Sequence, residues 1–260
     1  MTPRSIEDYR ARNEDAPLDL IAGNPGWRPV IQLINAWAKE KLDPASGYSS
    51  EELNNFSRTH DIHFPPVLRE WWRLAGRHPF VEPGLLSDNA FFLTPHDRSL
   101  IRRPNFLAIT IDDQQTWSGN GIHADFLMDA DPEIHGINST VGPHDAPGVT
   151  WYKGQFIATG LHLPALIFAT LLYHLFEPSP LVVDGAAYLE VERKGLLGGQ
   201  PDERLIFMLG LRRFSNDTIV GDIYSDGHDF IYWWLRGFVC RTAEAAERAR
   251  RAVPTHPHRW

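Results

Sequence analysis

The segment from Phe64 to Arg77 constrains the fold more than any other part of the chain. It begins with Pro65-Pro66, and proline is favoured in the first turn of a helix, where its missing N–H would have had no intrahelical partner. Four apolar residues then follow at i, i+3, i+4 and i+7, the spacing of one helix face: Leu68, Trp71, Trp72 and Ala75. We expect Gly76 to end this helix in the left-handed conformation. The segment predicts a short helix with a buried aromatic face.

A second helix is predicted just before it. Ser49 and Glu52 have the spacing of a capping box, in which each side chain binds the other residue's backbone N–H. Tyr48 and Leu53 flank the cap where a hydrophobic staple closes, and Leu53 and Phe56 supply the apolar face.

Together the two helices resemble the opening signature of the SUKH superfamily, which includes fungal cell-wall-synthesis regulators and bacterial toxin-immunity proteins. The residues that carry this signature are Glu52, Leu53, Phe56, Phe64, Pro65, Pro66, Leu68, Trp71, Trp72 and Gly76. Farther on, residues 105–109 resemble the first core strand of the family, 129–134 its Asp-Pro step and 161–176 its late apolar helix. The resemblance covers residues 48–176, implies a SUKH-like fold and gives no catalytic residues to carry over.

The rest of the chain alternates between apolar runs and turn residues. Further helices are expected at about 29–42, 163–176 and 242–253, the last with Thr242 as N-cap. The helix at 163–176 is apolar on nearly all sides, which predicts burial. Strands are expected at 106–111, around 122–126 after a turn at 118–121, at 148–156, 187–191, 205–211, 218–224 and 230–239, with 91–93 as a short edge. Turns are expected at 215–217 and 225–227.

This order predicts an α+β fold in which a mostly antiparallel sheet packs against the N-terminal helices, with a central buried helix and a C-terminal helix. We divide the chain into a loosely held leader (1–26), a SUKH-like core (27–176) and C-terminal strands with a helix (177–260). The last part is expected to continue the same domain by extending its sheet. A boundary near 177–186, which would make it a separate domain, is the alternative.

Composition narrows the class of protein. The 260 residues carry a formal net charge of -8, which argues against a sequence-independent nucleic-acid binder, because that function needs clustered cations. The single cysteine, Cys240, fits a reducing compartment and a small buried apolar role. The N-terminus has no apolar signal core, and the longest apolar run, 161–176, is too short to span a bilayer. We expect a cytoplasmic protein that binds no membrane.

No motif predicts a reaction or a cofactor. His60 and His63 lack the further converging ligands of a zinc site. Asp226-Gly227 between two apolar runs indicates a hairpin turn rather than a calcium loop. The sequence has neither a nucleophile elbow nor a phosphate-binding glycine loop. We therefore expect no catalytic residue, metal or cofactor.

An acidic cluster in a turn-rich region is the remaining candidate for function. Its members are Asp112, Asp113, Asp125, Asp129, Asp131 and Glu133. The cluster is interpreted either as a solvated loop face or as a surface that steers a basic protein partner. The SUKH resemblance implies a bacterial immunity protein that binds and occludes a cognate toxin. The alternatives are a regulatory or scaffolding module without a toxin partner and an enzyme of unfamiliar type.

Overall fold

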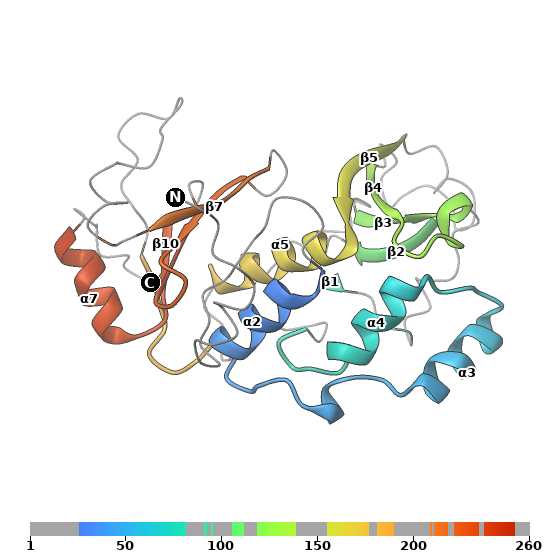
Figure 1. Cartoon of the computed structure of the whole chain (residues 1–260), viewed down its shortest axis with the longest axis horizontal. Helices are drawn as coiled ribbons and strands as arrows, with labels where there is room; N and C mark the ends of the chain where they lie inside the picture. The colour runs from blue at the N-terminus through green and yellow to red at the C-terminus, as the bar shows by residue number, and fades with distance from the viewer. Residues whose placement is uncertain are drawn as a thin grey trace, which may run out of the picture. The chain divides into compact units, whose positions relative to one another are not determined.

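The structure is a computed structural model, and it describes residues 26–81, 91–92, 95, 106–111, 119–138, 155–176, 181–189, 209, 211–217, 221–233 and 237–252. The helices and 3-10 turns are α2 (Arg28–Trp37), η1 (Pro44–Ser46), α3 (Ser50–His60), α4 (Pro66–Ala75), η3 (Ala124–Phe126), α5 (Leu163–Leu175) and α7 (Ala243–Ala252). The strands are β1 (Phe91–Phe92), β2 (Phe106–Ile111), β3 (Gly119–His123), β4 (Glu133–Asn138), β5 (Gln155–His162), β6 (Ala187–Leu189), β7 (Arg212–Asp217), β8 (Gly221–Ser225), β9 (Phe230–Trp233) and β10 (Gly237–Cys240). Every described strand pair is antiparallel, which confirms the α+β class (Figure 1).

The chain forms two compact units. One consists of residues 42–170, and the other combines residues 1–41 with 171–260. The domain boundaries expected from the sequence, at 26/27 and 176/177, stay a prediction. Among the described residues, no helix is both long and apolar enough to cross a membrane.

In the 42–170 unit, α3 and α4 form as the sequence predicts. The Ser49 hydroxyl accepts from the Glu52 N–H, and the Glu52 carboxylate accepts from the Ser49 N–H, which completes the capping box of α3. The predicted face of α4 is buried, and the Phe64 ring meets Trp72 edge-on at 4.9 Å between centroids. The N–H of Val67 bonds to the carbonyl of Ala130, which ties the start of α4 to the segment before β4. Both helix predictions are confirmed.

The predicted conformation of Gly76 is wrong. Its φ is -62°, in the right-handed helical region, so the left-handed turn is not what requires glycine. A Cβ atom at this position would lie 2.7 Å from the Trp72 carbonyl oxygen and 2.8 Å from two ring carbons of Tyr48. Glycine is required here because the end of α4 is packed against the residue that precedes the cap of α3.

The first sheet has the order β1-β2-β3-β4-β5, and β2 spans the predicted residues. The turn expected at 118–121 is wrong, because residues 119–121 lie inside β3. A Cβ on Gly121 would meet the Leu107 carbonyl oxygen at 2.2 Å and the Phe106 ring at 2.6 Å, so this glycine serves strand packing. β4 was not predicted; it takes in the end of the 129–134 step. The strand expected at 148–156 begins only at Gln155, and residues 148–154 lie outside the described residues.

The second sheet has the order β6-β10-β9-β8-β7, and none of its described strands pairs with the first sheet. The described strands of the C-terminal part thus form a sheet of their own. The expected strand at 230–239 holds two strands instead, β9 and β10, which pair antiparallel, and the expected turn at 215–217 lies within β7. Residues 205–208 lie outside the described residues. The predicted helix at 29–42 ends at Trp37, because Ala38 is extended and bridges to Val182.

The alanine face of α7 packs on this second sheet and closes its core. The buried residues of that core are Leu189, Leu209, Leu211, Tyr224, Phe230, Tyr232, Phe238, Cys240, Ala245, Ala246 and Ala249. Thr242 caps α7 by accepting from the Ala245 N–H, as predicted.

Candidate protein-binding surface

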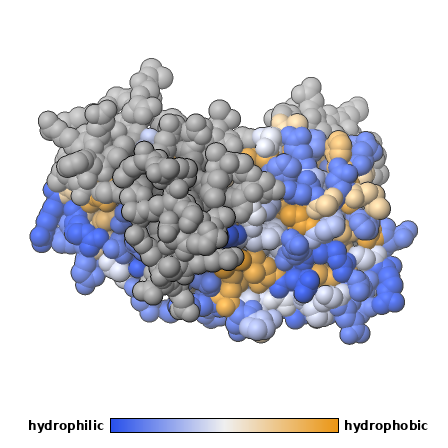
Figure 2. Space-filling model, viewed as in Figure 1, coloured by the Kyte–Doolittle hydropathy of each residue, from blue (hydrophilic) through white to orange (hydrophobic). Residues whose placement is uncertain are grey.

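The connection from β3 to β4 carries the two exposed large apolar side chains of the described residues. Phe126, in η3, is 40% exposed and Met128, in the turn that follows, is 74% exposed. The surface over α3 and α7 is by contrast mainly hydrophilic on the face shown in Figure 2. Aromatic and methionine side chains are enriched in protein–protein interfaces, so this connection is a candidate binding surface.

Histidines from the two paired strands hold the Phe126 ring. The His135 ring stacks on it with centroids 5.5 Å apart and an angle of 10°, and the His123 ring meets it at 6.1 Å. His123 is also the residue before η3, and its Nδ1 lies 3.3 Å from both the backbone nitrogen and Oδ2 of Asp125. The His123 side chain accepts from that N–H and so caps the turn. The ring of Phe126 is thus fixed in place although it is partly exposed.

The acidic residues of the predicted cluster divide into two groups. Asp131, two residues before β4, and Glu133 both bind groups of β5: Asp131 Oδ2 lies 3.2 Å from His162 Nδ1, and Glu133 Oε1 accepts from the Gly160 N–H at 2.7 Å. Both contacts join the start of β4 to the end of β5. Asp125 and Asp129 instead face solvent, with the Asp125 side chain 80% exposed. Asp112 and Asp113 lie outside the described residues.

The residues of the SUKH-like signature have structural contacts. Glu52 also binds Arg77 through Oε1, and the guanidinium carbon of Arg77 lies 4.5 Å from the centroid of the Tyr48 ring. Hydrogen bonds from the backbone and side chain of Ser49, followed by that from Arg77, lower the pKa of Glu52 to about 2. Phe56 meets the Tyr48 ring edge-on at 5.9 Å. The buried members are Leu53, Phe64, Pro65, Leu68, Trp71, Trp72 and Gly76, whereas Pro66 is exposed.

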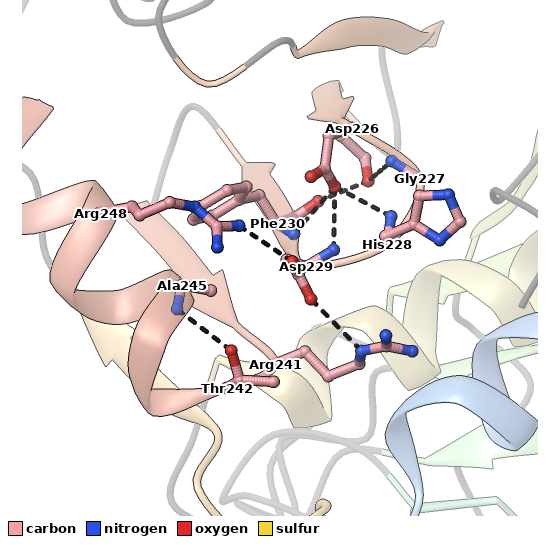
Figure 3. Close-up of polar contacts among 10 residues, drawn as sticks. Asp226, Gly227, His228, Asp229, Phe230, Arg241, Thr242, Ala245 and Arg248 are labelled. Carbon is pink, nitrogen blue, oxygen red and sulfur yellow. Dashed lines mark hydrogen bonds and ion pairs between the residues drawn. The ribbon is translucent and has the colours of Figure 1, made fainter.

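The carboxylates of a second acidic turn, between β8 and β9, bind backbone and side-chain groups of this same chain (Figure 3). The Asp226 carboxylate accepts from the N–H groups of His228, Asp229 and Phe230, which confirms the predicted hairpin turn. Asp229 Oδ2 accepts from Arg248 Nη2 at 2.9 Å, and the guanidinium carbon of Arg248 lies 5.2 Å from the centroid of the Phe230 ring. These carboxylates serve the turn and the packing of α7.

The described residues contain no group of three or more His, Cys, Asp and Glu side chains that could hold a metal ion. Cys240 lies fully buried in β10, and burial raises the pKa of its thiol to about 12. This agrees with the role of a small apolar residue that the sequence predicts.

Sequence reasoning did not single out Phe126 and Met128. The apolar side chain of Phe126 predicts a strand position, and the sequence pattern gives Met128 no role. The available signal was the composition of residues 125–129, where three apolar residues lie between two aspartates. No protein-family model, no curated protein and no solved structure matches this chain.

Proposed function

We propose that this chain is a non-catalytic protein-binding protein, and that it neutralises a cognate toxin by binding and occluding it. The immunity function is what the SUKH resemblance of residues 48–176 implies. The observation that carries the binding function is the exposed pair Phe126 and Met128, framed by the solvent-facing carboxylates of Asp125 and Asp129.

The chemistry of this surface favours a basic partner. The apolar pair supplies contact area, and the two carboxylates sit at its edge, where a charged rim directs encounter more than it adds affinity. The formal net charge of -8 acts in the same direction at longer range.

The direct test is co-expression with the products of the neighbouring genes, followed by measurement of the affinity by calorimetry and of the association rate by stopped-flow mixing. We expect a basic toxin to bind, and the double variant Asp125→Lys/Asp129→Lys to weaken binding mainly through slower association. The single variants Asp125→Lys and Asp129→Lys are compared with Asp184→Lys, a control with the same change in charge, because Asp184 lies in the other unit and its side chain is 84% exposed.

Three results separate the alternatives. Binding of a toxin with loss of its activity supports immunity. Binding of a partner without toxic activity supports the regulatory or scaffolding function. Turnover of a small molecule by the purified chain would overturn the non-catalytic proposal.

A further inference from the structure

Two arginines of this chain are held in the same way. Arg77 lies over the Tyr48 ring and bonds to the carboxylate of Glu52. Arg248 lies over the Phe230 ring and bonds to the carboxylate of Asp229 (Figure 3). In each case a carboxylate and an aromatic ring share one guanidinium group, an arrangement we call an acid–arginine–aromatic cluster. Its physical basis is the planar cation, which lies over the ring while its N–H groups bind the carboxylate.

The candidate surface presents two of the three parts of such a cluster. Asp125-Phe126 repeats the order of Asp229-Phe230. The His123 ring contacts both the Asp125 carboxylate and the Phe126 ring, which brings the acid and the ring to the same imidazole. His135 stacks on one face of the Phe126 ring, and the residue still keeps 40% of its surface exposed.

The third part of this cluster is not supplied by the described chain. Within the residues that the structure describes, no arginine or lysine forms an ion pair with Asp125 or lies over the Phe126 ring. The acid and the ring are both accessible, with an 80% exposed side chain and a 40% exposed residue, respectively.

We propose that Asp125 and Phe126 bind an arginine side chain of the partner protein. The guanidinium group lies against the exposed part of Phe126 and pairs with Asp125, and Met128 contacts the aliphatic residues beside that arginine. This inference rests on the proposed protein-binding function and names the residue type that is recognised. A lysine fits less well, because its compact ammonium group presents neither a plane to the ring nor a fork of donors to the carboxylate.

The test uses two synthetic peptides, Gly-Leu-Arg-Leu-Gly and Gly-Leu-Lys-Leu-Gly, titrated with the full chain and followed by NMR. The arginine peptide is expected to bind more tightly by at most about fivefold, the ratio that would hold if the lysine gained nothing from the exposed aromatic ring. Its δ-methylene protons should move upfield, because protons above a ring face are shielded by the ring current.

Three variants resolve the contributions. Phe126→Leu keeps the apolar bulk but removes the aromatic face, so it should abolish both the preference for arginine and the upfield shift. Asp125→Asn should weaken binding of both peptides. Asp184→Asn, which removes a carboxylate of similar exposure elsewhere, should leave both unchanged. The exposed positions of Asp125 and Phe126 allow each variant to fold, which the backbone amide spectrum verifies.

The outcomes separate this inference from the proposed function. Equal binding of the two peptides, an arginine preference that survives Phe126→Leu, or no binding of either peptide overturns the inference. A co-expressed partner that binds wild type and Phe126→Leu equally also overturns it, while leaving the protein-binding function in place. If no neighbouring gene product binds, the proposed function fails whatever the peptides do.

Discussion

Two corners of this protein are built around the dipeptide Asp-Phe, and they differ in what covers the ring. In the closed corner, residues 226–230 with Arg241 and Arg248, Phe230 is buried and Asp229 pairs with both arginines. In the open corner, residues 123–128 with His135, Phe126 and Asp125 are exposed. The same dipeptide is structural where a later helix supplies an arginine. It stays accessible where the described chain supplies only imidazole rings.

The two rings differ in burial because the elements that carry them differ. Phe230 belongs to the core under α7, and the guanidinium group of Arg248, a residue of that helix, lies over its ring. Phe126 projects from a three-residue 3-10 turn, which buries none of its own residues. A short turn held by a histidine cap and a ring stack can keep an aromatic side chain at the surface without enclosing it.

Truncation of the two rings should give the largest difference in stability between the two corners. Phe230→Ala should lower the free energy of unfolding by about 3–5 kcal/mol, because it leaves a cavity beneath α7. Phe126→Ala should cost about 0.5 kcal/mol, as at other surface positions. Urea denaturation of both variants measures the difference. Similar losses would mean that Phe126 belongs to the core and is not a binding residue.

Removal of the turn carboxylate tests the polar side of the closed corner. Asp226→Ala leaves three backbone N–H groups without their acceptor, and we expect a loss of about 2 kcal/mol in the free energy of unfolding. The matched change Asp125→Ala should cost about 0.5 kcal/mol, because that carboxylate is solvated. A large loss for Asp125→Ala alone would reverse the assignment of the two corners.

The Tyr48–Arg77–Glu52 cluster gives a smaller, pH-dependent effect. The pKa of Glu52 is lowered from 4.5 to about 2, so its contribution to stability is complete above pH 4.5 and is lost as the pH falls towards 2. Glu52→Gln removes this dependence, so the gap in melting temperature between wild type and variant should be constant near neutral pH and should shrink below pH 4.5.

Arg77→Gln sharpens this result. The Ser49 hydrogen bonds are the larger causes of the lowered pKa, and Arg77 is a lesser one. The arginine variant should therefore keep most of the pH dependence between 4.5 and 2. Its complete loss in Arg77→Gln would show that the arginine, and not the helix cap, holds the carboxylate ionised.

The features that sequence reasoning predicted correctly depend on contacts a few residues apart. The capping box of Ser49 and Glu52, the Thr242 cap and the turn at Asp226 each satisfy backbone groups within four residues. Side-chain type and spacing are then sufficient evidence. The α+β class follows from the same local signals added along the chain.

The features that were missed depend on distant partners. Residues 119–121 have turn-forming chemistry but lie in a strand, because Gly121 packs under the Phe106 ring and against the Leu107 carbonyl. The predicted acidic cluster was treated as one surface, yet Asp131 and Glu133 are held by groups of β5, about thirty residues later in the chain. The exposure of Phe126 likewise depends on which strands carry His123 and His135.

Labelling of the sole cysteine measures how easily the core of the closed corner opens. Cys240 lies in the same core cluster as Phe230, and burial raises its thiol pKa to about 12, so very little reactive thiolate is present at pH 8. Labelling by a thiol reagent should be negligible in the native protein and rapid in urea. Phe230→Ala should speed native labelling because it lowers the cost of opening the core beneath α7, whereas Phe126→Ala should leave the rate unchanged. Labelling that responds equally to both variants would mean that the open and closed corners unfold as one unit, and the separation between a structural and an accessible Asp-Phe pair would then be lost.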